Sequence, residues 1–149
     1  MKARYLKWLM NVWPPYRCAG IRVRRIDDDF RFVRVELRMG LTNRNYVNVH
    51  FGGSLFAMAD PFYMLMYIKN LGPDYVVWDK AAEIDFVRPG RGRVWAEFRL
   101  EDSDLARARA ETAFGQRFLT THPVEVFGPD DELVASIRRT IYIRRRVAR

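Results

Sequence analysis

The chain has 149 residues, of which 49% are hydrophobic and 14% aromatic, enough for one domain with a sizeable core. Its net charge of +8 comes mostly from arginine, which suits nucleic acid, anionic lipid or a phosphorylated ligand, or serves only solubility. Because Cys18 is the single cysteine, an internal disulfide is excluded and a cytoplasmic protein is expected, with Cys18 a small buried residue rather than a nucleophile.

The first predicted element is a short helix at 4–13, which Pro14-Pro15 ends. Four apolar residues recur along it at helical spacing: Tyr5, Trp8, Leu9 and Val12. We expect this apolar stripe to pack on the body of the fold. A membrane-surface role is the weaker alternative, because such anchors are usually longer. The sequence contains no secretory signal pattern and no stretch that is long enough to span a membrane.

Two strands are predicted next, at 21–26 and 30–39, and the polar turn 27–29 joins them. In the second strand apolar and polar residues alternate, which predicts one buried face and one wet face. The asparagine-rich stretch 42–48 has no periodicity and is interpreted as a loop.

The stretch 48–71 is the feature around which the rest of the chain is organised. From residue 54 to residue 68 it is apolar almost all the way round, which predicts a long buried helix that opens at Gly52-Gly53. Asp60 is the one acid inside this helix, and Pro61 is expected to kink it. A buried carboxylate is costly unless it is paired or used, so Asp60 either satisfies the kink or carries chemistry.

Four strands are predicted after this helix: 75–88, 93–100, 117–127 and 133–144. The first two are expected to form a hairpin around a Pro-Gly turn. A short helix at 105–114 follows this hairpin and ends at a glycine. Pro123 indicates that the third of these strands is edge-like or bulged.

The order of the elements predicts an α+β fold in which a curved antiparallel sheet wraps around one long central helix. Residues 1–149 are interpreted as a single domain, with the N-terminal helix within 1–15 and a basic tail at 145–149. A sheet of this kind leaves an edge and part of the helix uncovered. That arrangement favours a homodimer or a dimer of dimers.

Three parts of the sequence form a recognisable pattern. They are Asn45, the run His50-Phe51-Gly52-Gly53-Ser54, and Asp60, which follows the second glycine by seven residues. This pattern resembles the hotdog-fold superfamily of acyl-CoA thioesterases and dehydratases, and in particular the phenylacetyl-CoA-type thioesterases. The resemblance covers nearly the whole chain after residue 14 and implies a hotdog fold. In one departure, Phe51 stands between the histidine and the glycines and displaces His50 by one position.

The resemblance implies thioester hydrolysis, with Asp60 as general base or nucleophile and with His50, Gly52 and Gly53 at the catalytic site. The N–H groups of the glycines would polarise the thioester carbonyl. Gly53 and Asp60 lie about 10 Å apart along a helix axis, so one thioester group meets both only when two chains face each other. The active site is therefore expected at a dimer interface. No cofactor is expected besides the coenzyme A of the substrate.

Six residues are candidates for substrate binding: Asn45, Phe51, Ser54, Arg88, Arg91 and Arg93. The three arginines flank a Pro-Gly turn and could meet the phosphates of coenzyme A, or they form a solvated hairpin end. The arginine run that starts at Arg138 is interpreted as a solvent-exposed tail, with contact to coenzyme A or RNA as the alternative.

The main alternative function is a hotdog dimer that binds an acyl-CoA or acyl-carrier-protein thioester without hydrolysing it. A hydratase or dehydratase is a third hypothesis. Nucleic-acid binding is disfavoured, because the aromatic residues alternate as in a core rather than forming a stacking platform. Two histidines, His50 and His122, and one cysteine are too few for a zinc cluster, so no metal is expected.

Overall fold

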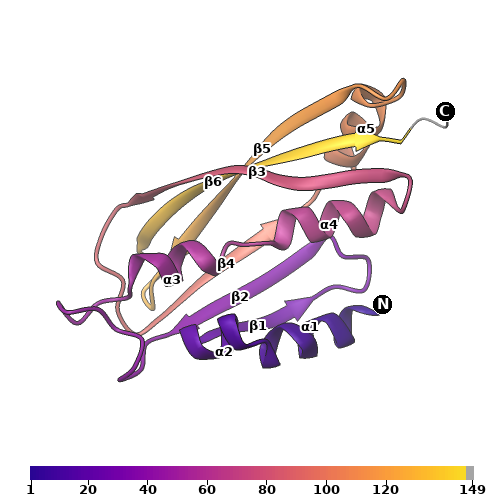
Figure 1. Ribbon diagram of the computed structural model, residues 1–149. Helices are drawn as coiled ribbons and strands as arrows, with labels where there is room; N and C mark the ends of the chain where they lie inside the picture. The colour runs from indigo at the N-terminus through magenta and orange to yellow at the C-terminus, as the bar shows by residue number, and fades with distance from the viewer. Residues whose placement is uncertain (147–149) are drawn as a thin grey trace.

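Six antiparallel strands form one curved sheet in the order β1-β2-β4-β5-β6-β3 (Figure 1). The computed structural model describes residues 1–146, so the end of the predicted basic tail, 147–149, lies outside the described residues. The strands are β1 (Ile21–Ile26), β2 (Phe32–Arg38), β3 (Tyr75–Phe86), β4 (Arg93–Arg99), β5 (Arg117–Phe127) and β6 (Leu133–Arg145). The helices are α1 (Ala3–Val12), α2 (Pro14–Ala19), α3 (Gly52–Ala57), α4 (Phe62–Leu71) and α5 (Asp102–Glu111). The predicted α+β class is confirmed, and none of these helices is long and apolar enough to cross a membrane.

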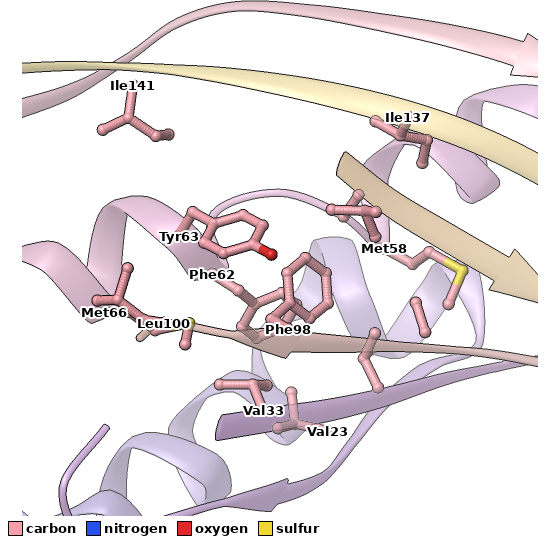
Figure 2. Close-up of a cluster of buried hydrophobic side chains, with 14 of the residues drawn as sticks. Val23, Val33, Met58, Phe62, Tyr63, Met66, Phe98, Leu100, Ile137 and Ile141 are labelled. Atoms are coloured by element: carbon pink, nitrogen blue, oxygen red, sulfur yellow. The ribbon is translucent and has the colours of Figure 1, made fainter. Parts of the chain in front are cut away.

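The core lies where α4 is enclosed by the sheet (Figure 2). Phe62 and Tyr63 of α4 pack against Phe98 of β4, with ring centroids 4.8 and 5.4 Å apart. Ile137 of β6 lies on one side of this cluster and Val33 of β2 on the other (Figure 2). Full burial of side chains of this size stabilises the fold by about 1.5–3 kcal/mol each, which holds the sheet around the helix.

The predicted single central helix is two short helices. α3 ends at Ala57 and α4 begins at Phe62, and the Asp60–Pro61 peptide bond between them is cis. Because proline has no N–H to continue the helical ladder, the expected kink is a complete break. The predicted position in the middle of the fold is right, but the predicted continuous helix is wrong.

The N-terminal helical segment is longer than predicted. Pro14 and Pro15 do end the first helix, but they also open α2, because proline is tolerated in the first turn of a helix. Helical structure therefore continues past residue 15 to Ala19. Cys18 lies on α2 and is exposed, so its predicted burial is wrong. Tyr16 is the buried residue of this short helix.

Helix α1 packs against β1 with a different face from the one we expected. Its buried residues are Ala3, Leu6 and Met10. The apolar stripe predicted to pack on the body of the fold is exposed: Tyr5, Trp8, Leu9 and Val12. The helix therefore has two apolar faces, and helical spacing alone does not say which of them meets the core.

Asn11 fixes α1 to the outer edge of β1. Its side-chain amide donates a hydrogen bond to the Val23 carbonyl at 3.0 Å, and the Val23 N–H donates to its Oδ1 at 2.8 Å. The asparagine thus pairs like one more strand residue and protects this edge of the sheet. The opposite edge is formed by β3, which pairs only with β6 among the described strands.

The predicted hairpin between the strands on either side of the Pro-Gly turn does not form. β4 pairs with β2 along its whole length, whereas β3 lies at the far edge of the sheet and pairs with β6. A turn signal fixes where the chain bends but not which strand each side pairs with. In the sheet, β5 and β6 stand between β4 and β3 (Figure 1).

Pro123 lies in β5, which stands between β4 and β6 in the sheet. The ladder between β5 and β4 is confined to the pairs Trp95–Phe127 and Ala96–Val126. At Pro123 the side of β5 that faces β4 therefore carries no ladder pairing, and a residue without an N–H is tolerated there. The predicted edge-like character is confirmed locally.

Candidate active site

A buried arginine holds two carboxylates at the break between α3 and α4. Arg139 of β6 has a side chain that is only 4% exposed, and its Nη2 donates to the carboxylate of Asp60 and, at 2.7 Å, to Oδ1 of Asp79 on β3. A charge this deeply buried is costly unless it is paired, and here it is paired twice. We call Asp60, Asp79 and Arg139 the Arg139 cluster.

Asp60 is fixed at its backbone as well as at its side chain. The hydroxyl of the buried Tyr16 donates to the Asp60 backbone carbonyl, and Arg139 binds Oδ1. The Asp60 side chain is nevertheless 49% exposed, and its Oδ2 has no protein hydrogen-bond partner within residues 1–146. The arrangement leaves one oriented carboxylate oxygen facing solvent, which is the geometry that a general base or a nucleophile needs.

The two carboxylates of the cluster differ in environment. Asp79 is more enclosed, with 22% of its side chain exposed. Burial raises the pKa of Asp79 above its ordinary value, while the hydrogen bond and the charge of Arg139 act in the opposite direction. Since one guanidinium faces two carboxylates, the cluster carries a net negative charge when both are ionised.

A second feature is a pocket of about 410 Å³ at the other end of α3. It is lined by Asn45, Val49, His50, Gly52, Leu55, Phe86, Val87, Arg88, Pro89 and Gly90, and we call it the glycine pocket. Four of the residues predicted for the site meet here: Asn45, His50, Gly52 and Arg88. The lining is mainly apolar, which suits an acyl chain or a similar apolar group.

The start of α3 needs glycine for close packing. A Cβ atom on Gly52 would lie 2.9 Å from Cζ of Phe86, which is closer than side chains tolerate. Helix α3 begins at Gly52 after Phe51, so the N–H groups of Gly52 and Gly53 belong to its first turn, where the helix itself supplies no acceptor. These two donors can polarise a carbonyl oxygen brought to them.

His50 has a structural contact and one unused nitrogen. Its Nε2 lies 3.0 Å from the Gly92 carbonyl oxygen, which can only accept, so Nε2 carries the proton. Its backbone N–H donates to the Gly90 carbonyl at 2.9 Å. Nδ1 is buried without a partner among the described residues, and burial lowers the pKa of the ring. His50 is thus a neutral residue that holds the 90–92 turn and keeps one free acceptor.

The other predicted site residues lie around the glycine pocket. Asn45 is fixed by its Oδ1, which accepts from the Val47 and Val49 N–H groups, both at 3.1 Å. Phe51 is exposed, and its ring lies over Gly53. Ser54 is buried and does not line the pocket.

The three arginines near the turn do not act as one group. Arg88 lines the glycine pocket, and Arg91 donates to the Asn48 carbonyl at 3.4 Å. Arg93 lines a separate pocket on the sheet, where its Nε is 3.9 Å from Glu36. The expectation that all three flank one site is therefore not met by Arg93.

The glycine N–H groups and the Asp60 carboxylate lie at opposite ends of α3. This helix is six residues long, which is about 9 Å at 1.5 Å per residue. A single thioester group cannot touch both ends. The two halves can serve one thioester group only if they come from two copies of the chain.

Sequence reasoning missed Arg139, because it treated the arginines from Arg138 onward as a solvent-exposed run. The signal was present: Ala135, Ile137, Ile141 and Ile143 point inward on β6, and Arg139 occupies the missing place in this alternation. An arginine at an inward position requires buried acids, and Asp60 and Asp79 supply them. Within residues 1–146, no three His, Cys, Asp or Glu side chains gather so that they could hold a metal ion.

Comparisons with known proteins place the fold. Residues 2–143 match the family DUF4442, described as a domain of unknown function. No curated protein matches the chain. A solved structure of PA5026 from Pseudomonas aeruginosa, a protein of unknown function and probable thioesterase, superimposes with a TM-score of 0.84 at 17% identity over 97% of each chain.

Two further solved structures have a similar fold. The thioesterase HI1161 from Haemophilus influenzae has a TM-score of 0.70 at 14% identity, over 99% of this chain and 94% of that one. The PaaI protein of the E. coli phenylacetic acid degradation operon has a TM-score of 0.65 at 18% identity, over 98% and 91%. At these identities the likeness shows the fold, and the resemblance to hotdog thioesterase-like proteins is confirmed at that level.

Proposed function

The chain therefore belongs to the DUF4442 family, and we propose that it is an acyl-CoA thioesterase whose active sites form between two copies of the chain. The observation that carries the proposal is the half-exposed carboxylate of Asp60, which Arg139 orients and which keeps Oδ2 free. The likeness to thioesterase folds supports the same reaction class.

The proposed reaction joins the two halves described above. The thioester carbonyl lies against the N–H groups of Gly52 and Gly53 of one subunit, which stabilise the negative charge that develops on its oxygen. Oδ2 of Asp60 from the other subunit takes a proton from water as the water oxygen attacks the carbonyl carbon. The carbon–sulfur bond then breaks, and the thiolate of coenzyme A recovers the proton. Arg139 touches no substrate and acts as a positioning residue.

A homodimer is expected because one side of the protomer is left apolar and open. The outer edge of β3 has no partner among the strands of residues 1–146, and Ile68 of α4 with Trp78 of β3 line a hollow beside it. Trp78 is 63% exposed, and Phe86 at the other end of β3 is 58% exposed. An exposed strand edge of this length is a site for pairing with another chain.

The dimer prediction can be tested with a matched pair of tryptophans. Trp78 on β3 and Trp8 on α1 are 63% and 64% exposed, at opposite edges of the sheet. We expect Trp78→Glu to shift the protein from dimer to monomer in light scattering and to lower thioesterase activity in proportion, while Trp8→Glu leaves the dimer intact. A wild-type protein that is a folded monomer at micromolar concentration would contradict the shared site.

The substrate prediction is tested by measuring thiol release from acyl-CoA thioesters of different chain length, with acyl-carrier-protein thioesters as the comparison. If Arg88 and Arg91 meet the phosphates of coenzyme A, the double change to alanine should raise KM several-fold, leave kcat nearly unchanged, and reduce the salt dependence of KM. Arg93→Ala is the matched control, because Arg93 lies at a separate pocket. Equal effects of both variants would remove these arginines from the proposal.

One observation favours a second candidate function. Asp60 is already paired with Arg139, and a carboxylate held by an arginine is a weaker base than a free one. A protein that binds acyl thioesters without hydrolysing them would tolerate this pairing. Tight binding of acyl-CoA in calorimetry, with no thiol release from any member of the panel, would favour this function over the enzyme.

A further inference from the structure

The N-terminal helix α1 carries an apolar face that no other part of residues 1–146 covers. Ala3, Leu6 and Met10 meet the core, and the opposite side of the helix exposes a row of large side chains. In Figure 1, α1 lies at the outer side of β1. These are Tyr5, Trp8, Leu9 and Val12, with Trp13 just beyond the helix end and Met1 before it. Trp8 is the most prominent of them within the helix, and we call this set the α1 outer face.

The α1 outer face is held rigidly in position. Asn11 exchanges two hydrogen bonds with Val23, and Arg22 donates to the Asn11 carbonyl at 3.2 Å. The helix therefore cannot roll to bury its outer side chains without breaking its contacts with β1. Exposure of this face is a fixed property of the fold.

The surroundings of this face are strongly basic. Residues 1–26 contain seven basic residues and no acid, since the first acidic residue is Asp27; the basic residues are Lys2, Arg4, Lys7, Arg17, Arg22, Arg24 and Arg25. Arg24 and Arg25 form ion pairs with Glu36 and Asp27. The others form no ion pair within the described part of the chain, and three of them, Lys2, Arg4 and Lys7, lie at or on α1 itself.

We propose that the α1 outer face docks on an anionic lipid surface. The sequence pattern first suggested that this stripe would be buried, and the fold instead turns it outward among basic side chains. A helix that lies in a membrane interface needs this combination of aromatic and aliphatic residues on one side with lysine and arginine beside them. Tryptophan and tyrosine are the side chains that prefer the headgroup region.

Charge argues against a second copy as the occupant. Two α1 outer faces brought together would place two sets of unpaired lysines and arginines next to each other, and like charges in contact are unfavourable. The surface is also separate from the proposed dimer edge, because α1 packs on β1 and β3 lies at the other end of the sheet. Lipid docking therefore leaves the β3 edge free.

The test is binding of the full chain to vesicles of phosphatidylcholine alone or of phosphatidylcholine mixed with phosphatidylglycerol, measured by co-sedimentation. We expect binding to the mixed vesicles only, and weaker binding as salt is raised. The double variant Trp8→Ser, Leu9→Gln should bind at least about tenfold more weakly. Phe114→Ser is its control, since Phe114 is an exposed aromatic residue remote from α1 in the chain.

A charge series makes the assignment sharper. Reversal of Lys2, Arg4 and Lys7 to glutamate should abolish binding to the mixed vesicles. The control variant reverses the charge of three exposed arginines at the ends of β5 and β6: Arg117, Arg145 and Arg146. It changes the net charge by the same amount and should weaken vesicle binding much less. Unchanged circular dichroism and thermal midpoints show that each variant is folded.

Several results would overturn the proposal. Absence of binding to both kinds of vesicle would do so, as would equal loss of binding in both charge variants, which would indicate nonspecific attraction. A change of oligomeric state in the Trp8 and Leu9 variant would assign the face to a second copy. Binding to an acidic carrier protein that depends on Trp8, with no vesicle binding, would assign it to a protein partner.

Discussion

Replacement of Asp60 by asparagine is expected to lower the turnover of acyl-CoA hydrolysis by about 100-fold or more, the effect of losing a general base. The amide keeps the shape of the side chain but cannot take a proton from water. The fold should survive, because Arg139 keeps its second carboxylate partner, Asp79, at 2.7 Å. Turnover and the thermal midpoint, measured on the same preparation, separate the two effects.

Asp79→Asn is the matched control for this experiment. It removes the other carboxylate of the Arg139 cluster and leaves Asp60 with its free oxygen. We expect it to change stability more than turnover. If Asp60→Asn retains nearly full turnover, Asp60 only satisfies the break before Pro61, and the catalytic assignment fails.

Mixed dimers test whether the site is shared. A subunit with Asp60→Asn lacks the base, and a subunit with Gly53→Val lacks the open helix start, where a valine side chain would meet the ring of Phe51. The exposed Phe51 ring can move aside, so the second variant should fold. Combined in one dimer, the two subunits leave one intact site and should recover part of the activity. No recovery in verified heterodimers would refute the shared site even if Asp60 is essential.

Replacement of Arg139 by methionine is expected to destabilise the protein by about 3 kcal/mol at neutral pH, the usual cost of leaving buried charges without their partner. Methionine fills a similar space but leaves Asp60 and Asp79 facing each other without a cation. Urea unfolding measures the effect, and Arg139→Lys should recover part of the stability. A loss below about 1 kcal/mol would show that solvent already screens the two carboxylates.

The loss of stability caused by Arg139→Met should depend on pH. The pKa of Asp79 is raised above its ordinary 3.8, so the folded state binds this proton more tightly than the unfolded state does. The contribution of Asp79 to stability therefore falls as pH rises from 3.8 through its raised pKa. Without Arg139 the pKa rises further, so the difference between variant and wild type should grow towards neutral pH and shrink in acid. A pH-independent difference would contradict the role of Asp79.

Alternation and turn residues were enough to locate most of the strands. Strand β1 was predicted with its observed bounds, as was β5, because hydrophobic period and turn residues are local signals. The strand order was harder, since the pairing of β3 with β6 depends on contacts between residues far apart in the sequence. The central helix was overextended because its apolar residues continue through Asp60 and Pro61, where the backbone breaks.

Only part of the candidate site could be predicted, because some of its residues give local sequence signals and others depend on contacts between distant segments. Asp60 and the glycines stand out in the sequence, because an acid in an apolar stretch and a glycine pair are visible without a structure. Arg139 and Tyr16 do not stand out, because they reach Asp60 only once β6 and α2 have folded around it. Helix α1 has two apolar faces, and only the folded structure shows which of them packs against β1 and which is exposed.

The two edges of the sheet differ in whether their backbone groups are already hydrogen-bonded, and this difference limits how many copies can join through the sheet. Asn11 occupies hydrogen-bonding groups of Val23 at the β1 edge, while the outer edge of β3 has no partner among the described strands. If two copies join through β3 about a twofold axis, the edge left at either end of the joined sheet is β1, on which α1 packs. Assembly through the sheet then stops at two chains, whereas a protomer with two open edges could extend into a fibre.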